Sequence, residues 1–254
     1  MSDRALQDDV IRALSEAPYR ASTEWRRRAL ADPDRMERYA RFLARHYYHE
    51  RIVHFFKYSR ALARVTGRPP EGVLTSAAFD ALLPTLVLGS RATAAAVARL
   101  VVDHVAGGRT AVPYLPDLLQ YEEAMMVVEA GPRVWRDETG GAGRGERDLP
   151  EKVEGTMLLE LAYDLPAVLP MLRRPWTDVP QAPQRPTRLL IARSPHGRVT
   201  VARSGPGVAE VVRLADGKRT LQDLAAGAGL DPGALQATLQ DLVDLGAVRF
   251  STGS

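Results

Sequence analysis

The sequence is short of the residue types that carry much of enzyme chemistry. Its 254 residues include no cysteine and only five histidines. Without thiols the chain can form no disulfide, no thiolate metal site and no cysteine nucleophile. Any chemistry would therefore depend on the histidines and the carboxylates, which is a small catalytic inventory.

Long apolar segments are also missing. No apolar run approaches the roughly 20 residues that a membrane-spanning helix needs. The N-terminal sequence MSDRALQDDVIRAL lacks the basic-then-apolar order of a signal peptide. With 45% apolar and 26% charged residues, the composition is that of a globular protein. We therefore expect a soluble, cytoplasmic protein with no membrane partner.

Lysine is scarce, and nearly all basic residues are arginines. The 34 basic and 31 acidic side chains give a formal net charge of only +3. Arginine raises the isoelectric point without adding net charge at neutral pH. A protein that binds nucleic acid needs a concentrated positive field, and this overall balance does not supply one.

The first half of the chain shows helical periodicity almost throughout. Apolar residues recur at helical spacing, and the segments are separated by proline and glycine. The predicted helices are Asp9–Ala17, Arg35–Gly67, Ser76–Leu88, Ala92–Ala106 and Pro116–Trp135. We predict an all-helical N-terminal domain over residues 1–137.

The segment TGGAGRGER marks the predicted domain boundary, since it is too polar to pack and rich in glycine. We expect a flexible linker over residues 138–155. After it, Thr156–Tyr163 has strand composition, and Arg188–Arg203 is typical of a β-hairpin that turns at residues 194–197.

Three further helices are predicted after the hairpin, and each has a clear boundary signal. Thr220 with Asp223 resembles a capping box, and Asp231 followed by Pro232 is an N-cap with proline in the first turn. The helices are Pro206–Ala215, Thr220–Ala228 and Pro232–Leu245, followed by a short strand, Ala247–Phe250. The fold class is therefore α+β: a helical domain, then a small three-stranded sheet with three helices over residues 156–254, similar to a winged helix.

Three strands followed by three helices resemble the peptide-binding modules called RiPP recognition elements, which are related to the PqqD chaperone family and serve ribosomally synthesised, post-translationally modified peptides. Such a module needs an open strand edge and an apolar groove beside it. The candidate peptide contacts are Val199, Val201 and Arg203 on the edge strand, with Leu235, Leu239 and Val243 on the last helix. The alternative for each apolar residue is an ordinary place in the core.

Winged-helix DNA-binding regulators share this pattern and form the main alternative. A helix that reads DNA needs cationic and amide side chains, because phosphates dominate affinity. The segment Pro232–Leu245 contains no arginine or lysine and carries Asp241 and Asp244. We therefore favour a peptide over nucleic acid as the partner.

The segment Tyr114-Leu115-Pro116-Asp117-Leu118, leading into Tyr121-Glu122, resembles a segment of the partner proteins of multinuclear non-haem iron-dependent oxidases. The segments 79–90 and 158–172 are also similar to that family. The resemblance implies a non-catalytic subunit, without a cofactor of its own, that presents a precursor peptide to an iron enzyme. It makes Tyr114, Asp117, Tyr121 and Glu122 candidates for contacting the enzyme. The alternative is that Pro116 and Asp117 start a helix that the two tyrosines pack.

A third hypothesis is a metal-dependent enzyme using the segment HYYHERIVH. His46, Glu50 and His54 are spaced four residues apart and share one helix face. Two helical turns separate His46 from His54 by about 12 Å, too far for one ion to bind both. His46 and Glu50 could form half of a site, but solvated residues on an arginine-rich face explain the pattern as well.

Overall fold

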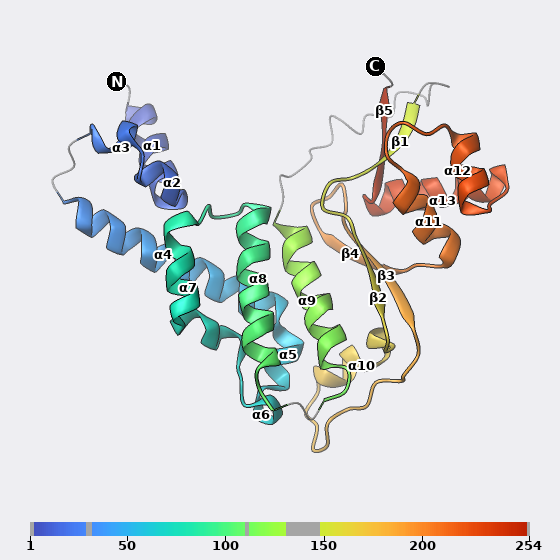
Figure 1. The fold of residues 1–254 in the computed structure, drawn as a ribbon, viewed down its shortest axis with the longest axis horizontal. Coiled ribbons are helices and arrows are strands. Elements are labelled where there is room, and N and C mark those ends of the chain that lie inside the picture. Colours follow the sequence, from blue (N-terminus) through green and yellow to red (C-terminus); the bar gives the residue numbers. More distant parts are fainter. Residues whose placement is uncertain (1–2, 29–31, 110–111, 131–147, 253–254) are drawn as a thin grey trace. The chain divides into compact units, whose positions relative to one another are not determined.

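The computed structural model of this protein describes residues 3–28, 32–109, 112–130 and 148–252 (Figure 1). The chain divides into two compact units. The first comprises Met1–Met126 and Leu172–Val179, and the second comprises Val127–Met171 and Pro180–Ser254. Of the described helices, none combines the length and the apolar character needed to cross a membrane.

The first unit is helical, as the sequence predicts. Two of its helical segments, η1 and η2, are short 3₁₀ helices. The last helix, α9, belongs to this unit as far as Met126. The elements are α1 (Asp3–Ser15), α2 (Ala17–Arg20), α3 (Thr23–Arg26), α4 (Pro33–Phe55), α5 (Lys57–Ala61), α6 (Ala63–Thr66), η1 (Pro70–Thr75), α7 (Ala77–Leu82), η2 (Leu83–Thr85), α8 (Arg91–Ala106) and α9 (Leu115–Glu129).

Side-chain caps begin four of these helices, including α3, where the Ser22 hydroxyl accepts from the N–H of Trp25. The Asp32 carboxylate accepts from the N–H of Arg35 at the start of α4, and Ser76 and Ser90 do the same for α7 and α8. Each cap satisfies an amide that has no partner inside its helix. The starts of these helices are therefore encoded in short local sequence signals.

The predicted single helix over Arg35–Gly67 is wrong as a continuous element, because the chain breaks at Phe56. Phe56 has φ −95° and ψ 32°, outside the helical range, and α5 begins directly after it. The Glu122 carboxylate from α9 accepts from the main-chain N–H groups of Tyr58 and Ser59 in α5. A buried side chain thus replaces the helical partners that these two amides would otherwise have.

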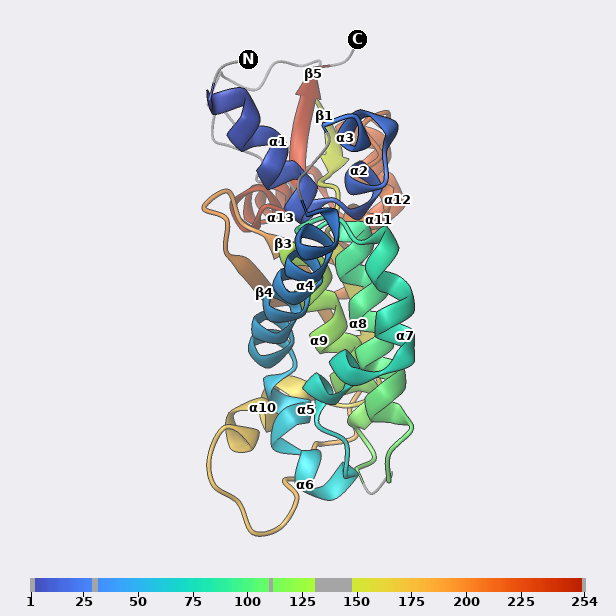
Figure 2. The same cartoon turned by 90° about the vertical axis from the view of Figure 1, so that its left-hand side faces the viewer.

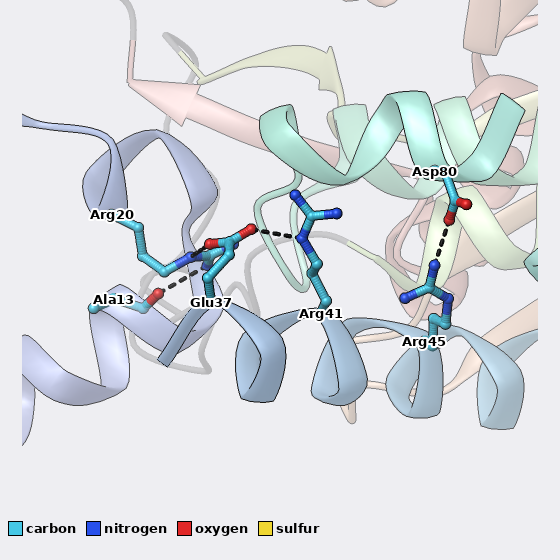
Figure 3. A network of polar contacts seen from close by, with 6 residues as sticks. All are labelled: Ala13, Arg20, Glu37, Arg41, Arg45 and Asp80. Atoms are coloured by element: carbon cyan, nitrogen blue, oxygen red, sulfur yellow. Dashed lines mark hydrogen bonds and ion pairs between the residues drawn. The ribbon is translucent and has the colours of Figure 1, made fainter. Parts of the chain in front are cut away.

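The long helix α4 runs obliquely past α7 and α8 in Figure 1, is foreshortened in Figure 2, and contacts α8 and η1. Polar contacts tie it to its neighbours near its start and at its middle (Figure 3). Arg20 donates to Glu37 of α4 at 2.9 Å and to the carbonyl of Ala13 in α1 at 2.8 Å. Further along α4, Arg45 forms an ion pair with Asp80 of α7. These contacts place the N-terminal helices against the first half of α4.

The second unit mixes two small antiparallel sheets with helices, which confirms the predicted α+β class. One sheet has the strand order β2-β3-β4, and the other pairs β1 with β5. The elements are β1 (Asp148–Lys152), β2 (Met157–Leu161), α10 (Leu165–Leu172), β3 (Thr187–Arg193), β4 (Val199–Arg203), α11 (Pro206–Leu214), α12 (Leu221–Ala228), α13 (Pro232–Leu245) and β5 (Val248–Thr252).

The predicted linker over residues 138–155 needs a correction. Residues 138–147 lie outside the described residues. The rest contains β1, which pairs antiparallel with β5 from Asp148 opposite Thr252 to Lys152 opposite Val248. Sequence reasoning missed β1 because its partner strand lies about a hundred residues further along the chain and the segment has no alternating apolar pattern.

One apolar core joins the three-stranded sheet to the three helices that follow it. Leu190 and Ala192 of β3 contribute from the sheet, and all three helices contribute from the other side. The core residues are Leu190, Ala192, Val211, Val212, Ala215, Leu224, Leu235, Leu239, Leu242, Ala247 and Val248. The strand β4 pairs with β3 of this sheet, and its Thr200 hydroxyl lies near the end of α13, where the candidate site lies.

Candidate peptide-binding strand edge

The strand β4 lies at one side of its sheet. Within the described residues it pairs only with β3, and the antiparallel register places Ile191 opposite Val201. A four-residue turn connects the two strands, closed by the N–H of Gly197 donating to the carbonyl of Ser194 at 2.8 Å. Gly197 has φ 78°, a conformation that suits glycine. The predicted hairpin and its turn are thus confirmed.

The hydrogen bonds of the hairpin show which main-chain groups face outward. The N–H of Ser194 donates to the carbonyl of Arg198, and the N–H of Ser204 donates to the carbonyl of Arg188. Bonded positions alternate along an antiparallel pair, so the even-numbered residues of β4 bond to β3. The N–H and C=O groups of the odd-numbered residues point away from β3. These residues are Val199, Val201 and Arg203, the three that the sequence predicts for the edge.

The two faces of β4 differ in chemistry. The Thr200 hydroxyl lies 3.2 Å from the carbonyl of Leu245, at the end of α13, so the even-numbered residues face the helices. The odd-numbered side chains share the other face. There Val201 is 38% exposed, one of the few large apolar side chains at the surface of the described residues. An added strand would meet an apolar side chain at the middle of β4.

Arg203, at the far end of β4, is held by a buried carboxylate. Asp164, which directly precedes α10, has a side chain only 1% exposed, and it forms ion pairs with Arg203, at 2.5 Å, and with Arg185. Burial acts to raise the pKa of Asp164, but hydrogen bonds from Arg185 and Arg203 outweigh it and hold the pKa below its ordinary value. Asp164 is therefore ionised at neutral pH and fixes both guanidinium groups.

Sequence reasoning missed Asp164 and Arg185. They lie 21 residues apart, and Asp164 is 39 residues from Arg203, so no local motif joins the three. The available signal was Asp164 itself, a carboxylate directly before the apolar segment Leu165–Leu172. A buried acidic residue requires a cationic partner, and this part of the chain is rich in arginine.

Fewer residues of α13 are accessible to a peptide than the sequence predicts. Leu235 and Leu239 are 3% and 2% exposed and belong to the core beneath the sheet. They are therefore core residues and not peptide contacts, which corrects the sequence-based assignment. Val243 is half-buried and remains a candidate.

The predicted enzyme contacts on α9 also need correction. Tyr114, Tyr121 and Glu122 are buried, with Glu122 fully inaccessible to solvent. They stabilise the helical unit from within and offer no surface to a partner, so the alternative of a packed helix start describes them better. Asp117, in the first turn of α9, is half-buried and remains a candidate contact.

The histidine-rich part of α4 does not gather into a metal site. His46, Glu50 and His54 are all exposed, and the His46 ring stacks on Phe42 with the centroids 6.2 Å apart. Across the described residues there is no cluster of three or more histidine, aspartate or glutamate side chains that could bind a metal ion.

Comparisons with known proteins provide no further guide to this site. No protein-family model matches the chain, and no curated protein matches it.

Proposed function

We propose that this chain is a non-catalytic partner subunit that binds a ribosomal precursor peptide along β4 and presents it to a separate multinuclear non-haem iron oxidase. The observation that carries the proposal is the outer edge of β4, where three consecutive odd-numbered residues direct their N–H and C=O groups away from the sheet. Within the second unit, the sheet β2-β3-β4 and the later helices α11, α12 and α13 support the resemblance to RiPP recognition elements, and α10 and the β1–β5 pair are additional to that pattern.

An extended peptide is the ligand that such an edge binds best. Main-chain hydrogen bonds supply affinity for any sequence, while alternate side chains on the two faces supply specificity. Here the faces are distinct, since Val201 and Arg203 lie on one and Thr200, beside α13, lies on the other. A peptide that pairs with β4 would therefore be read on both sides.

The proposed division of labour separates binding from chemistry. Anchoring a leader segment on this subunit raises the local concentration of the rest of the peptide at the oxidase. The iron belongs to the partner enzyme in this proposal, and the chain acts through affinity for the two other components. Asp117 is the remaining predicted contact with the oxidase.

The first experiment is co-expression with the neighbouring open reading frames. A tagged copy of the chain should purify together with an iron-containing subunit, and metal analysis of the complex should place the iron in that subunit. Stoichiometric iron in the chain purified alone would overturn the non-catalytic assignment.

The second experiment tests strand addition directly by fluorescence polarisation. The probe is a fluorescein-labelled leader segment of a precursor peptide encoded beside the gene. Val201→Pro removes an outward N–H that makes no bond to β3, so the sheet should persist while peptide binding is lost. The matched control is Glu160→Pro in β2, because the register of β2 with β3 directs the Glu160 N–H to the opposite edge of the sheet. Equal binding by Val201→Pro and the wild type would refute the site.

A DNA-binding regulator remains the second candidate, since α11–α13 and the hairpin have a winged-helix-like order. The exposed side chains of α13 argue against it, because Asp241 and Asp244 lie on the surface of the helix that would enter the major groove. Duplex binding that weakens steeply between about 50 and 200 mM salt would support this candidate and contradict the first.

A further inference from the structure

The segment that forms the candidate site is strongly basic. Residues 185–205 contain five arginines and no acidic residue. The arginines are Arg185, Arg188, Arg193, Arg198 and Arg203. The two carboxylates that pair with them come from elsewhere in the second unit: Glu160 of β2 pairs with Arg188 at 3.0 Å, and Asp164 is shared by Arg185 and Arg203. The hairpin segment itself therefore contributes only positive formal charges beside the open edge.

Arg203 is the arginine best placed to contact an added strand. It lies on the same face of β4 as Val201, two residues away, and its side chain remains 52% exposed despite the ion pair with Asp164. A guanidinium group has five N–H donors, and one of them serves Asp164. Because the buried Asp164 fixes the group, less side-chain entropy is lost when Arg203 binds a second carboxylate.

The opposite face of β4 disfavours anions. The Thr200 hydroxyl contacts the carbonyl of Leu245, at the negative end of the α13 dipole. The last two turns of α13 also carry the exposed carboxylates of Asp241 and Asp244, and Gln240 donates to Asp244 at 3.0 Å. An acidic side chain on this face would lie near the negative end of the α13 dipole.

We propose that the peptide bound at β4 has an acidic residue at one defined position. It places a carboxylate opposite Arg203 and an apolar side chain opposite Val201, with no acidic residue between them. Cross-strand pairs on one face lie close enough for opposite charges and apolar groups to interact. The intervening side chain would face α13, where anions are disfavoured. This inference rests on the proposed function, since it names the chemistry of the peptide that strand addition would select.

The test is a selection from a random dodecapeptide library displayed on messenger RNA, using the full chain as bait. The enriched peptides should contain aspartate or glutamate two residues from an apolar, β-branched residue, without an acidic residue between. Parallel selections use Arg203→Gln, which removes the charge, and Arg203→Lys, which retains it. The acidic preference should vanish with Arg203→Gln and persist with Arg203→Lys, while the apolar preference should remain in both. Thermal unfolding of both variants checks that the fold is intact.

A synthetic copy of one enriched peptide then gives the size of the effect. Replacing its acidic residue by the matching amide should weaken binding to the wild type about three- to tenfold at low salt, with a smaller loss at 0.5 M salt. The same replacement should leave binding to Arg203→Gln unchanged.

The outcomes separate the two proposals. Enriched peptides that require the β4 edge, as shown by loss with Val201→Pro, but that carry no acidic excess would overturn this inference and leave the proposed function standing. An acidic excess that survives in Arg203→Gln would also overturn it. If no enriched peptide is weakened by Val201→Pro, strand addition itself is refuted, and the proposed function falls with it.

Discussion

The Glu122 carboxylate of α9 accepts a 2.7 Å hydrogen bond from the main-chain N–H of Tyr58, which lies 64 residues earlier in the chain. The same carboxylate also accepts from the N–H of Ser59. Glu122 is fully buried. It therefore joins α9 to the start of α5 inside the helical unit and accounts for the break after α4.

Burial gives this contact a pH dependence. Desolvation raises the pKa of Glu122 to about 8 from an ordinary value of 4.5, although hydrogen bonds from Ser59 and Tyr58 oppose the shift. The contribution of Glu122 to stability is therefore complete below about pH 4.5 and is lost as the pH rises through 8.

Glu122→Gln should remove this pH dependence. The amide oxygen can still accept from both main-chain N–H groups, and the side chain no longer titrates. In urea unfolding between pH 5 and 9, the wild type should lose up to about 1.4 kcal/mol per pH unit between the ordinary pKa of 4.5 and the folded-state pKa of about 8, the loss should level off above pH 8, and the variant should lose less. Parallel pH profiles for the two proteins would contradict a buried carboxylate that changes its protonation state.

Tyr48→Phe should stabilise the protein. Tyr48 is fully buried between Tyr47 and Phe79, and among the described residues its hydroxyl has no hydrogen-bond partner. Removing a buried, unsatisfied hydroxyl should raise the free energy of unfolding by about 1 kcal/mol. The matched control is Tyr19→Phe, which loses a 3.1 Å hydrogen bond to Asp9 and should lower stability by a similar amount. Thermal unfolding of both variants should show shifts of opposite sign.

Asp164→Asn should destabilise the second unit and loosen the edge strand. The variant loses the charge on which Arg185 and Arg203 converge, at a cost of about 1–2 kcal/mol, since both arginines are partly exposed and can be hydrated. Because the folded-state pKa of Asp164 is lowered, this contribution is present above the ordinary value near 3.8 and is lost as the pH falls through the lower folded-state pKa. The stability gap between wild type and variant, measured by urea unfolding, should therefore narrow in acid. A gap of constant size from pH 7 to pH 2 would contradict the ionised pair.

Gly246→Ala should be more damaging than Gly197→Ala, although both glycines have a left-handed conformation, with φ 81° and 78°. A Cβ atom at Gly246 would lie 2.2 Å from the carbonyl oxygen of Arg193, whereas a Cβ atom at Gly197 would meet nothing within 4 Å. Gly197→Ala should therefore cost about 1 kcal/mol from backbone strain alone, and Gly246→Ala at least about 2–4 kcal/mol. Equal losses in chemical denaturation would show that α13 does not approach the hairpin this closely.

The parts of the fold that sequence predicts well are those with local causes. Thr220 and Asp223 form the predicted capping box, and Asp231 caps α13 at the predicted position. The β3–β4 hairpin also follows from alternation and a turn with glycine at its end. Each of these signals lies within a few residues of the structure that it determines.

The parts that sequence does not predict depend on distant residues. The break at Phe56 is stabilised by Glu122 of α9, and Arg203 is fixed by Asp164, a carboxylate that no local motif connects to it. The apolar spacing of α13 shows that one face is buried, but it cannot show that Leu235 and Leu239 face the protein's own sheet and Val243 faces partly outward. The sequence therefore predicts the edge-strand residues of the candidate site correctly, but it assigns too many residues of α13 to that site.

The outward-facing amides of β4 also bear on the behaviour of the chain without its ligand. A strand with an unsatisfied edge can pair with the same strand of a neighbouring molecule, which is a common route to aggregation. Such pairing would bring together two copies of the arginine-rich segment 185–205, whose charge Glu160 and Asp164 offset in part. Electrostatic repulsion between these segments should oppose self-association of the ligand-free protein. This repulsion should weaken as the salt concentration rises.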